Sequence, residues 1–358
     1  MTTQKNLGID LNFFNYKVGV TFDIYDKVTD DLLQKDVEIP TSTGFSKVNY
    51  YNSGKAKNYG WEFRVDLKNI VQLKDFSLSA NFNISRNRNK IMELPSNKNF
   101  TNYDNVSNGK YATSVQIGNP LGSFYGYQFL GVYQNEEQTI ARDGAGQYIS
   151  DLSGNPVYMK VRDYQMRPGD AIYADINHDG VIDEYDIVYL GNAMPTLNGG
   201  FGLTLRYGNL RLKPFFQFRT GQSLINRMRI NSESMYGKNN QSQAVLKRWR
   251  HEGDDTDIPR ALWQTGYNYL GSDRFVEDAS FVRLKNITLS YSLPKSWLRK
   301  LGFTRCDVYI TGYDLFTWTK YTGLDAEVSP KTGLHELTED NSATPRQKRL
   351  AIGLTIDF

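Results

Sequence analysis

The feature that most constrains this chain is an alternation of apolar and polar residues that recurs from its first segments to its last. Residues 61–67, 76–84 and 349–358 are clear examples. A period of two is that of a β-strand with one apolar and one polar face. The pattern predicts roughly ten to twelve antiparallel strands. Many of them have nine residues or more, which is about the length that a tilted strand needs to cross a bilayer.

Residues 201–218 form the clearest predicted hairpin. Two alternating runs are separated by Gly208-Asn209, a dipeptide that supplies the positive φ angles of a tight turn. Little helix is expected, for example around residues 241–250 in a long loop, and residues 294–301 are expected to form a helical turn.

The predicted connections differ greatly in length. The turn at residues 208–209 is tight, whereas residues 91–123, 134–197 and 223–278 form long connections. Tight turns at one end and long loops at the other are typical of outer-membrane barrels. The predicted fold class is therefore all-β, with antiparallel transmembrane β-barrel strands and long extracellular loops. The alternative that the same alternation permits is a water-soluble β-sandwich.

Composition excludes several other classes of protein. No run of about 18 apolar residues occurs, which excludes a transmembrane helix but not a barrel, where only alternate residues face lipid. The 42 basic and 39 acidic residues nearly balance, so charge gives no argument for nucleic-acid binding. Cys306 is the single cysteine, so no intrachain disulfide can form. Residues 1–5 lack the apolar stretch of a signal peptide, and we expect the beginning of an exported protein to be missing.

Residues 175–186 carry a ligand pattern that matches the calcium loop of an EF-hand. Oxygen donors fall at the ligand positions of that loop, and a glycine occupies the position of its sharp turn. The predicted metal ligands are Asp175, Asn177, Asp179, Val181 through its carbonyl, Asp183 and Asp186. Asp186 stands where a bidentate glutamate is usual. The pattern predicts a structural Ca²⁺ that orders a long loop, and the alternative is a polar surface turn that binds nothing.

No motif in the sequence predicts catalysis. His178, His251 and His335 are far apart, and there is no nucleophile elbow, phosphate-binding glycine loop or His-Glu-x-x-His. A carboxylate pair could serve a surface glycoside hydrolase, but a chain with 39 acidic residues always permits such a pair. We therefore expect that the protein is not an enzyme. Four loop aromatics could stack on sugar rings, although packing between loops is favoured: Tyr236, Trp263, Tyr267 and Tyr269.

Several short motifs extend over most of the chain. They include Asn58-Tyr-Gly60-Trp-Glu62, Gly118-Asn-Pro120, Pro168-Gly-Asp170, Arg248-Trp249, Asp257-Ile-Pro259-Arg260, Ser280-Phe-Val-Arg283 and Tyr321-Thr-Gly323. Together they resemble one family, the SusC/RagA group of TonB-dependent outer-membrane transporters of Bacteroidetes-type bacteria.

The resemblance implies a barrel of about 22 strands in the cell outer membrane. It also implies TonB-dependent import of oligosaccharides or peptides, with a SusD-like lipoprotein at the extracellular mouth. Residues 1–358 would be the C-terminal portion, without plug, TonB box or signal peptide, so that TonB-ExbB-ExbD would act through the missing N-terminal part. Residues 160–198 would be an extracellular loop with the calcium motif, and Phe358, a C-terminal aromatic, would be the signal for barrel assembly.

Part of a barrel raises a physical problem. Its two edge strands would present unpaired N–H and C=O groups to lipid, which cannot satisfy them. We therefore expect a fragment, a split chain or a truncated gene product that does not insert stably alone. The alternative is that the chain does not lie in a membrane and is an extracellular, calcium-stabilised β-sandwich module that binds carbohydrate.

Overall fold

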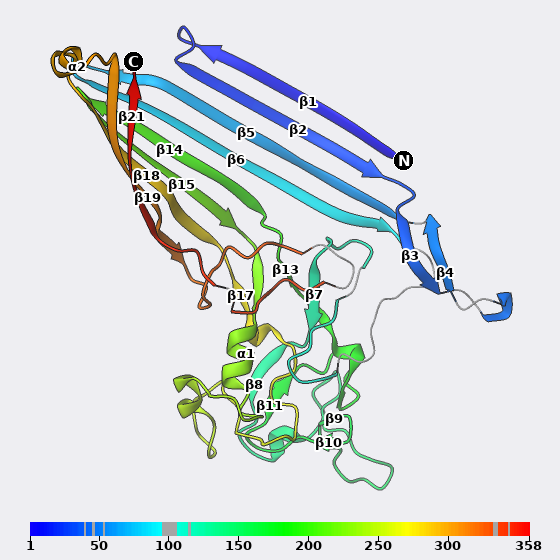
Figure 1. Ribbon diagram of the computed structural model, residues 1–358. Coiled ribbons are helices and arrows are strands. Elements are labelled where there is room, and N and C mark those ends of the chain that lie inside the picture. Colours follow the sequence, from blue (N-terminus) through cyan, green and yellow to red (C-terminus); the bar gives the residue numbers. More distant parts are fainter. Residues whose placement is uncertain are drawn as a thin grey trace.

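The structure is a computed structural model that describes residues 1–38, 41–44, 47–52, 54–94, 106–113, 116–331, 336–342 and 344–358. Its main feature is one antiparallel sheet of nine strands; of the remaining elements, the helix α2 (Lys295–Leu301) lies at one end of the sheet and the others lie beyond the opposite end (Figure 1). The strand order is β1-β2-β5-β6-β14-β15-β18-β19-β21, so each strand pairs with the next one of the sheet along the chain. This succession of hairpins is how an outer-membrane barrel is built.

The strands of the large sheet are long. The shortest has 9 residues and the longest have 18. Each strand is therefore long enough to cross a membrane, which takes about nine residues. Their bounds are β1 Thr2–Phe13, β2 Val18–Thr29, β5 Lys55–Gln72, β6 Phe76–Glu93, β14 Leu197–Tyr207, β15 Leu210–Thr220, β18 Phe281–Ser292, β19 Arg305–Thr319 and β21 Arg349–Asp357.

The register places apolar side chains on one face of the sheet and polar side chains on the other. Phe82 of β6 lies opposite Val65 of β5 and Phe201 of β14. The next residue, Asn81, lies opposite Asp66 on the other face. Large apolar side chains on the first face are exposed to the surroundings, among them Leu7, Ile24, Leu203, Ile310, Ile352 and Leu354. Exposed apolar residues in alternation with polar ones are what a lipid-facing barrel wall requires.

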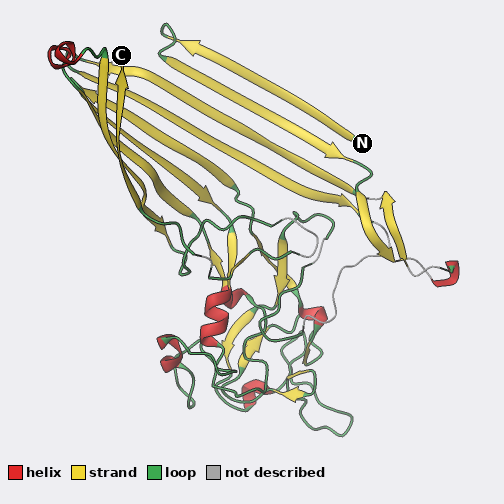
Figure 2. Ribbon diagram, viewed as in Figure 1, coloured by secondary structure: helices red, strands yellow, loops and turns green. Residues whose placement is uncertain are grey.

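The sandwich alternative is wrong. In the part of the chain that the structure describes, no second sheet packs on either face of the large one (Figure 2). A sandwich would bury its apolar face between two sheets. In this structure the apolar side chains of that face are exposed. β1 and β21 form the two edges of the sheet.

The connections have the predicted asymmetry. Short turns join strands at one end, at residues 14–17, 73–75 and 208–209, and a longer turn at this end contains the helix α2 (Lys295–Leu301), as predicted. All long connections leave the other end, where residues 30–54 contain the hairpin of β3 (Leu33–Glu38) and β4 (Lys47–Asn52).

Two details of the predicted connections need correction. The predicted loops 91–123 and 134–197 belong to a single connection between β6 and β14, because the alternating residues between them form β7 (Ser123–Gly126) and β8 (Phe129–Val132), which pair outside the large sheet. These strands are only four residues long and therefore too short to cross a membrane. In the turn at residues 208–209, only Gly208 has a positive φ, +56°.

The remaining elements are short and lie within the long connections. They are β9 Lys160–Val161, β10 Tyr164–Gln165, β11 Ala171–Tyr173, β12 Val181–Ile182, β13 Val188–Asn192, β16 Ser223–Asn226, β17 Val276–Asp278, β20 Glu339–Asp340, α1 Arg227–Glu233, and the 3-10 turns Thr41–Thr43, Glu137–Thr139, Glu184–Asp186, Gln243–Lys247 and Asp273–Phe275. The turn at Gln243–Lys247 lies where helix was predicted, whereas α1 was not predicted. None of the described helices is long and apolar enough to cross a membrane.

Candidate functional site

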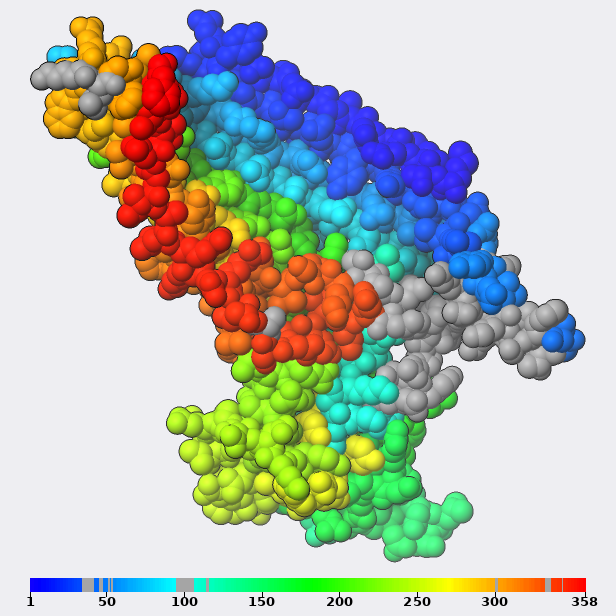
Figure 3. Space-filling view, viewed as in Figure 1, coloured from blue at the N-terminus to red at the C-terminus, as the bar shows by residue number. Residues whose placement is uncertain are grey.

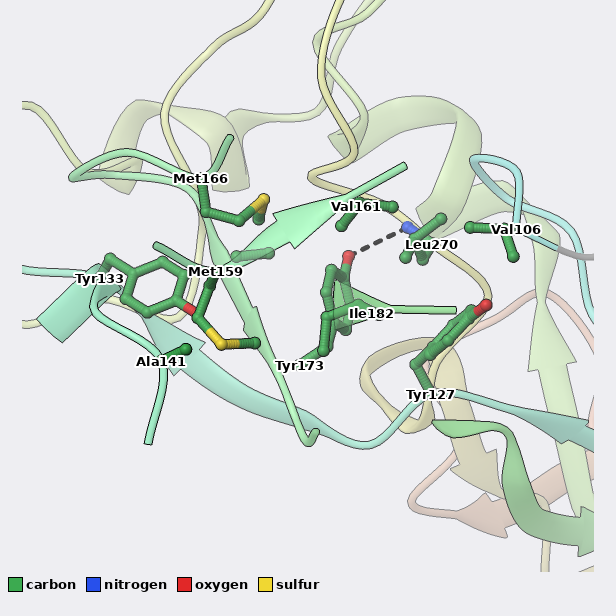
Figure 4. Close-up of a cluster of buried hydrophobic side chains, with 11 residues drawn as sticks. Val106, Tyr127, Tyr133, Ala141, Met159, Val161, Met166, Tyr173, Ile182 and Leu270 are labelled. Carbon is green, nitrogen blue, oxygen red and sulfur yellow. Dashed lines mark hydrogen bonds between the residues drawn. The ribbon is translucent and has the colours of Figure 1, made fainter. Parts of the chain in front are cut away.

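The long connections fold together into a unit that we name the loop subdomain, made of the described residues within 106–196, 221–280 and 320–342. Figure 3 shows most of it as a green and yellow lobe, and its orange to red segment, which follows β19, lies between that lobe and the strands. Two apolar cores stabilise it. The first joins residues far apart in sequence, including Val106, Tyr127, Tyr133, Met159, Tyr173, Ile182 and Leu270 (Figure 4). The second includes Tyr111, Phe124, Leu224, Ile230, Phe275 and Phe281.

The predicted calcium loop, residues 175–186, lies on the first core. Its apolar residue Ile182 is almost completely buried there, at 1% exposure, and β12 pairs in parallel with β9. Gly180 has a φ of +83°, and a Cβ at this position would lie 2.9 Å from the Cβ of Ala141. The middle of the loop is therefore fixed by the core, and the sharp turn requires glycine.

The carboxylates of the loop turn inward and accept backbone N–H groups. Asp175 accepts from Gly180 at 2.8 Å, and Asp183 accepts from Tyr185 at 2.8 Å. Asp186 is fully buried and accepts from both Ile176, at 2.7 Å, and Asp183, at 2.8 Å. Asp186 thus joins the two ends of the loop.

The same carboxylates are close enough to affect one another. Burial raises the pKa of Asp186 to about 6; nearby Asp175 and Asp183 add to this rise, and the two hydrogen bonds from backbone N–H groups oppose it. Burial also raises the pKa of Asp183, with contributions from Glu184, Asp179 and Asp175. A cation among these groups would remove that repulsion.

The arrangement nevertheless does not form a closed metal site. Among the described residues, no three side chains of His, Cys, Asp or Glu converge on a point where they could hold a metal ion. Asn177 donates to Asp179 at 2.9 Å, and Asp179 accepts the N–H of Val181 at 2.8 Å. The donors suit Ca²⁺ in chemistry and in spacing, but the carboxylates are engaged with the backbone of their own loop.

A buried ion pair, which sequence reasoning did not identify, joins two distant parts of the loop subdomain. Asp170 is completely buried and accepts from the guanidinium of Arg260 at 2.7 Å and 3.2 Å. Tyr164 and Asn268 also donate to it, at 3.0 Å and 3.3 Å. The signal in the sequence was the presence of Pro168-Gly-Asp170 and Pro259-Arg260 among the family motifs.

Gly169, the residue before Asp170, packs against the Arg248-Trp249 motif. Gly169 has a φ of +87°, and an added Cβ would lie 2.3 Å from the indole of Trp249. The backbone N–H of Arg260 donates to the carbonyl of Gly169 at 2.7 Å. Three motifs that are separate in the sequence are therefore one packed unit in the structure.

A second ion-pair network fixes the segment after β19 to the polar face of the wall. Arg283 of β18 is buried and pairs with Asp325 at 2.5 Å and with Glu327 at 2.7 Å. Lys285 and Arg346 approach the same Glu327 carboxylate, at 3.2 Å and 3.0 Å. The segment is thereby held against the sheet at the end from which the long loops leave.

Most of the loop aromatics pack together, as favoured by sequence reasoning. Tyr236 contacts Tyr269 edge to face, and Tyr267 contacts Tyr164 in the same way. Trp263 is exposed.

The other residues singled out in the sequence lie apart from one another. His178 is in the left-handed region, with a φ of +58°, and His251 pairs with Asp254 at 3.1 Å. His335 lies outside the described residues. Phe358 is exposed and touches Phe303 edge to face.

Comparison with known proteins gives consistent results along the whole chain. No protein-family model matches it. It is 30% identical over 363 residues to TonB-dependent receptor P3 of Formosa agariphila, which covers 99% of this chain and 34% of that protein. It is 29% identical over 376 residues to TonB-dependent receptor SusC of Bacteroides thetaiotaomicron, which covers 100% of this chain and 32% of that protein. The chain spans about a third of the length of these curated relatives.

Solved structures agree with the sequence matches. The RagAB peptide transporter superposes with a TM-score of 0.71 at 26% identity, covering 100% of this chain and 35% of that one. The RagAB peptide importer in its closed-closed state superposes with a TM-score of 0.69 at 25% identity, again over 100% of this chain and 35% of that one. The wall and the loop subdomain are therefore matched together.

Proposed function

This chain belongs to the SusC-type TonB-dependent receptors of the outer membrane, and we propose that it forms part of the wall and the extracellular loops of a transporter that imports oligosaccharides or peptides. The observation that carries the proposal is the match to the RagAB peptide transporter, which extends over the whole chain. The polar face of the sheet would line the lumen. The loop subdomain would stand at the extracellular mouth, because the long loops of such barrels are extracellular.

The proposal includes two partners. A SusD-like lipoprotein would contact the loop subdomain, which would form a large surface next to the barrel mouth. TonB-ExbB-ExbD would supply energy through parts of the transporter beyond this chain. In this account the Arg283 network keeps the segment after β19 against the wall, so that the lumen stays open beside it.

Uptake measured in living cells tests this function. Deleting the gene is expected to abolish import of a labelled oligosaccharide or peptide pool, and a protonophore is expected to abolish import in the parent strain. The substrate class follows from which pool is affected. Import of both pools at the parental rate in the deletion strain would contradict the proposal.

Calcium is a further part of the proposal. Asp175, Asn177, Asp179, Asp183 and Asp186, with the carbonyl of Val181, would hold one Ca²⁺ that orders the connection between β6 and β14. Support comes from the spacing of the hard oxygen donors and from the mutual repulsion of the carboxylates. The ion would have a structural role, since it would lie on the first core and away from the lumen wall.

Calcium binding is testable by hydrogen exchange of residues 175–186 in the intact protein. Millimolar Ca²⁺ is expected to slow exchange there, by a factor that grows with the ratio of free Ca²⁺ to Kd. Asp175→Asn combined with Asp179→Asn should remove the effect. Asp151→Asn is the matched control, because Asp151 also accepts backbone N–H groups in an exposed turn of the subdomain. Equal exchange with and without Ca²⁺ in the unaltered protein would reject the calcium site.

A further inference from the structure

The apolar face of the wall changes character at the end nearest the loop subdomain. Along β6, alternate residues are apolar from Phe76 to Ile84. The next three residues of the same face are Arg86, Arg88 and Lys90. The lipid-facing band therefore ends at Ile84, and three cations follow it within a few residues. With the loop subdomain outside the cell, as in the proposed function on which this inference rests, these cations would lie at the height where the headgroups of the outer leaflet begin.

The partner strand extends this basic surface. The register sets Arg86 opposite Trp61, Arg88 opposite Tyr59 and Lys90 opposite Lys57. The ammonium of Lys57 lies 5.5 Å from the centre of the Tyr59 ring and pairs with Asp26 at 2.5 Å. Two lysines directly opposite one another repel. Tyr and Trp beside them are the residues that favour the membrane interface.

The three cations of β6 have no acidic partner among the residues that the structure describes. Within the described ranges of the chain, no carboxylate lies within ion-pair distance of Arg86, Arg88 or Lys90, and the buried Nε of Arg86 has no hydrogen-bond partner. On the polar face, by contrast, Arg283 is paired with Asp325 and Glu327. Charge that is left unpaired here is available to a ligand.

A cavity of about 500 Å³ is lined by two of these cations, Arg88 and Lys90. β14 pairs with β6 only as far as Ser85, and the loop at Asn119 takes over the pairing at Ile91, so the cavity occupies the gap between them. Figure 1 shows that β6 extends beyond β14 toward β3. The described residues that line the cavity include cations, amides, hydroxyls and two tyrosines but no carboxylate: Arg88, Lys90, Asn87, Asn89, Asn192, Thr196, Ser223, Tyr59 and Tyr189.

We propose that Arg86, Arg88 and Lys90, with the adjoining cavity, bind the phosphate groups of a phosphorylated lipid headgroup in the outer leaflet. Guanidinium groups pair with phosphate through two parallel hydrogen bonds, and lysine neutralises its charge. A lipid is favoured over a free anion because the basic residues continue the lipid-facing surface of β6. The headgroup would relieve the repulsion between Lys57 and Lys90 and close the gap in the wall.

Native mass spectrometry of the full-length transporter in mild detergent tests this proposal. The probes are bisphosphorylated lipid A, the same lipid without its phosphates, and inorganic phosphate. The test variant is Arg88→Gln with Lys90→Gln. Its matched control is Lys68→Gln with Lys74→Gln, which removes the same charge from the same hairpin at the end with short turns.

The phosphorylated lipid is expected to bind the unaltered protein and the control equally. The test variant should bind it about 30-fold more weakly, since each cation near an anionic surface contributes roughly a factor of five. Heat-resistant migration of the variant on gels would show that it still folds. Equal binding of the dephosphorylated lipid would overturn the proposal, as would equal binding by the test variant. Displacement of the lipid by millimolar inorganic phosphate would assign the site to a free anion instead.

Discussion

Replacing Arg260 by methionine is expected to lower the local stability of the loop subdomain by about 3–5 kcal/mol, the usual cost of leaving one partner of a buried ion pair without the other. Asp170, which is 0% exposed, would keep only the donors Tyr164, Asn268 and the backbone N–H of Arg167. Hydrogen exchange of the peptides around residues 164–170 and 258–268 measures the effect, because it reports local opening even where the barrel stays folded.

Arg250→Met is the matched control for this experiment. Arg250 lies on the same connection, is exposed and donates to the carbonyl of Leu246 at 3.3 Å. Its replacement should change exchange by less than about 0.5 kcal/mol, as for surface positions in general. If Arg260→Met and Arg250→Met had the same small effect, the Asp170 pair would not be what holds these two loops together.

A pair of substitutions on neighbouring residues of β14 should have opposite outcomes. Leu203 is exposed on the apolar face, opposite Ala80, and Thr204 is on the polar face, opposite Ser79. Leu203→Arg would place a charge in lipid and is expected to cost about 2–4 kcal/mol near the middle of the bilayer. Thr204→Arg would place the same charge in the wet lumen, where the cost should be small. Urea unfolding of the full-length protein in lipid vesicles compares the two.

If Thr204→Arg were the more damaging change, the polar face would be the buried or lipid-facing one, and our assignment of lumen and lipid would be inverted. Equal costs would indicate that neither face meets hydrocarbon.

Sequence reasoning predicted the wall well because its signal is local. The alternation along Phe76–Ile84 sets both the strand and its faces, and Gly208 marks a turn that the structure contains. The register then follows from the turns and from the need to keep apolar residues on one face. The long loops at one end were predicted in the same way, from where alternation stops.

The loop subdomain was less accessible to such reasoning because long-range contacts determine it. Asp170 and Arg260 are 90 residues apart, and no local pattern pairs them. β7 and β8 have four residues each, too few for periodicity to assign them to the wall or to a loop. The helix α1 has seven residues, and the side chain of Asn226 caps it by accepting the N–H of Arg229. The calcium pattern is local, so sequence reasoning found it, but the geometry of its ligands depends on the core beneath it.

The central claim is that the wall crosses the outer membrane with the loop subdomain outside the cell. Labelling of single cysteines on intact cells with a membrane-impermeant maleimide tests it most directly, in a background where Cys306, the single cysteine of these 358 residues, and any cysteine elsewhere in the transporter are replaced by serine. Leu152→Cys lies in the loop subdomain at a fully exposed position, and Lys74→Cys lies in the short turn between β5 and β6. We predict that intact cells label Leu152→Cys at once and label Lys74→Cys only after the outer membrane is disrupted. Labelling of Lys74→Cys on intact cells, or protection of Leu152→Cys, would contradict this topology.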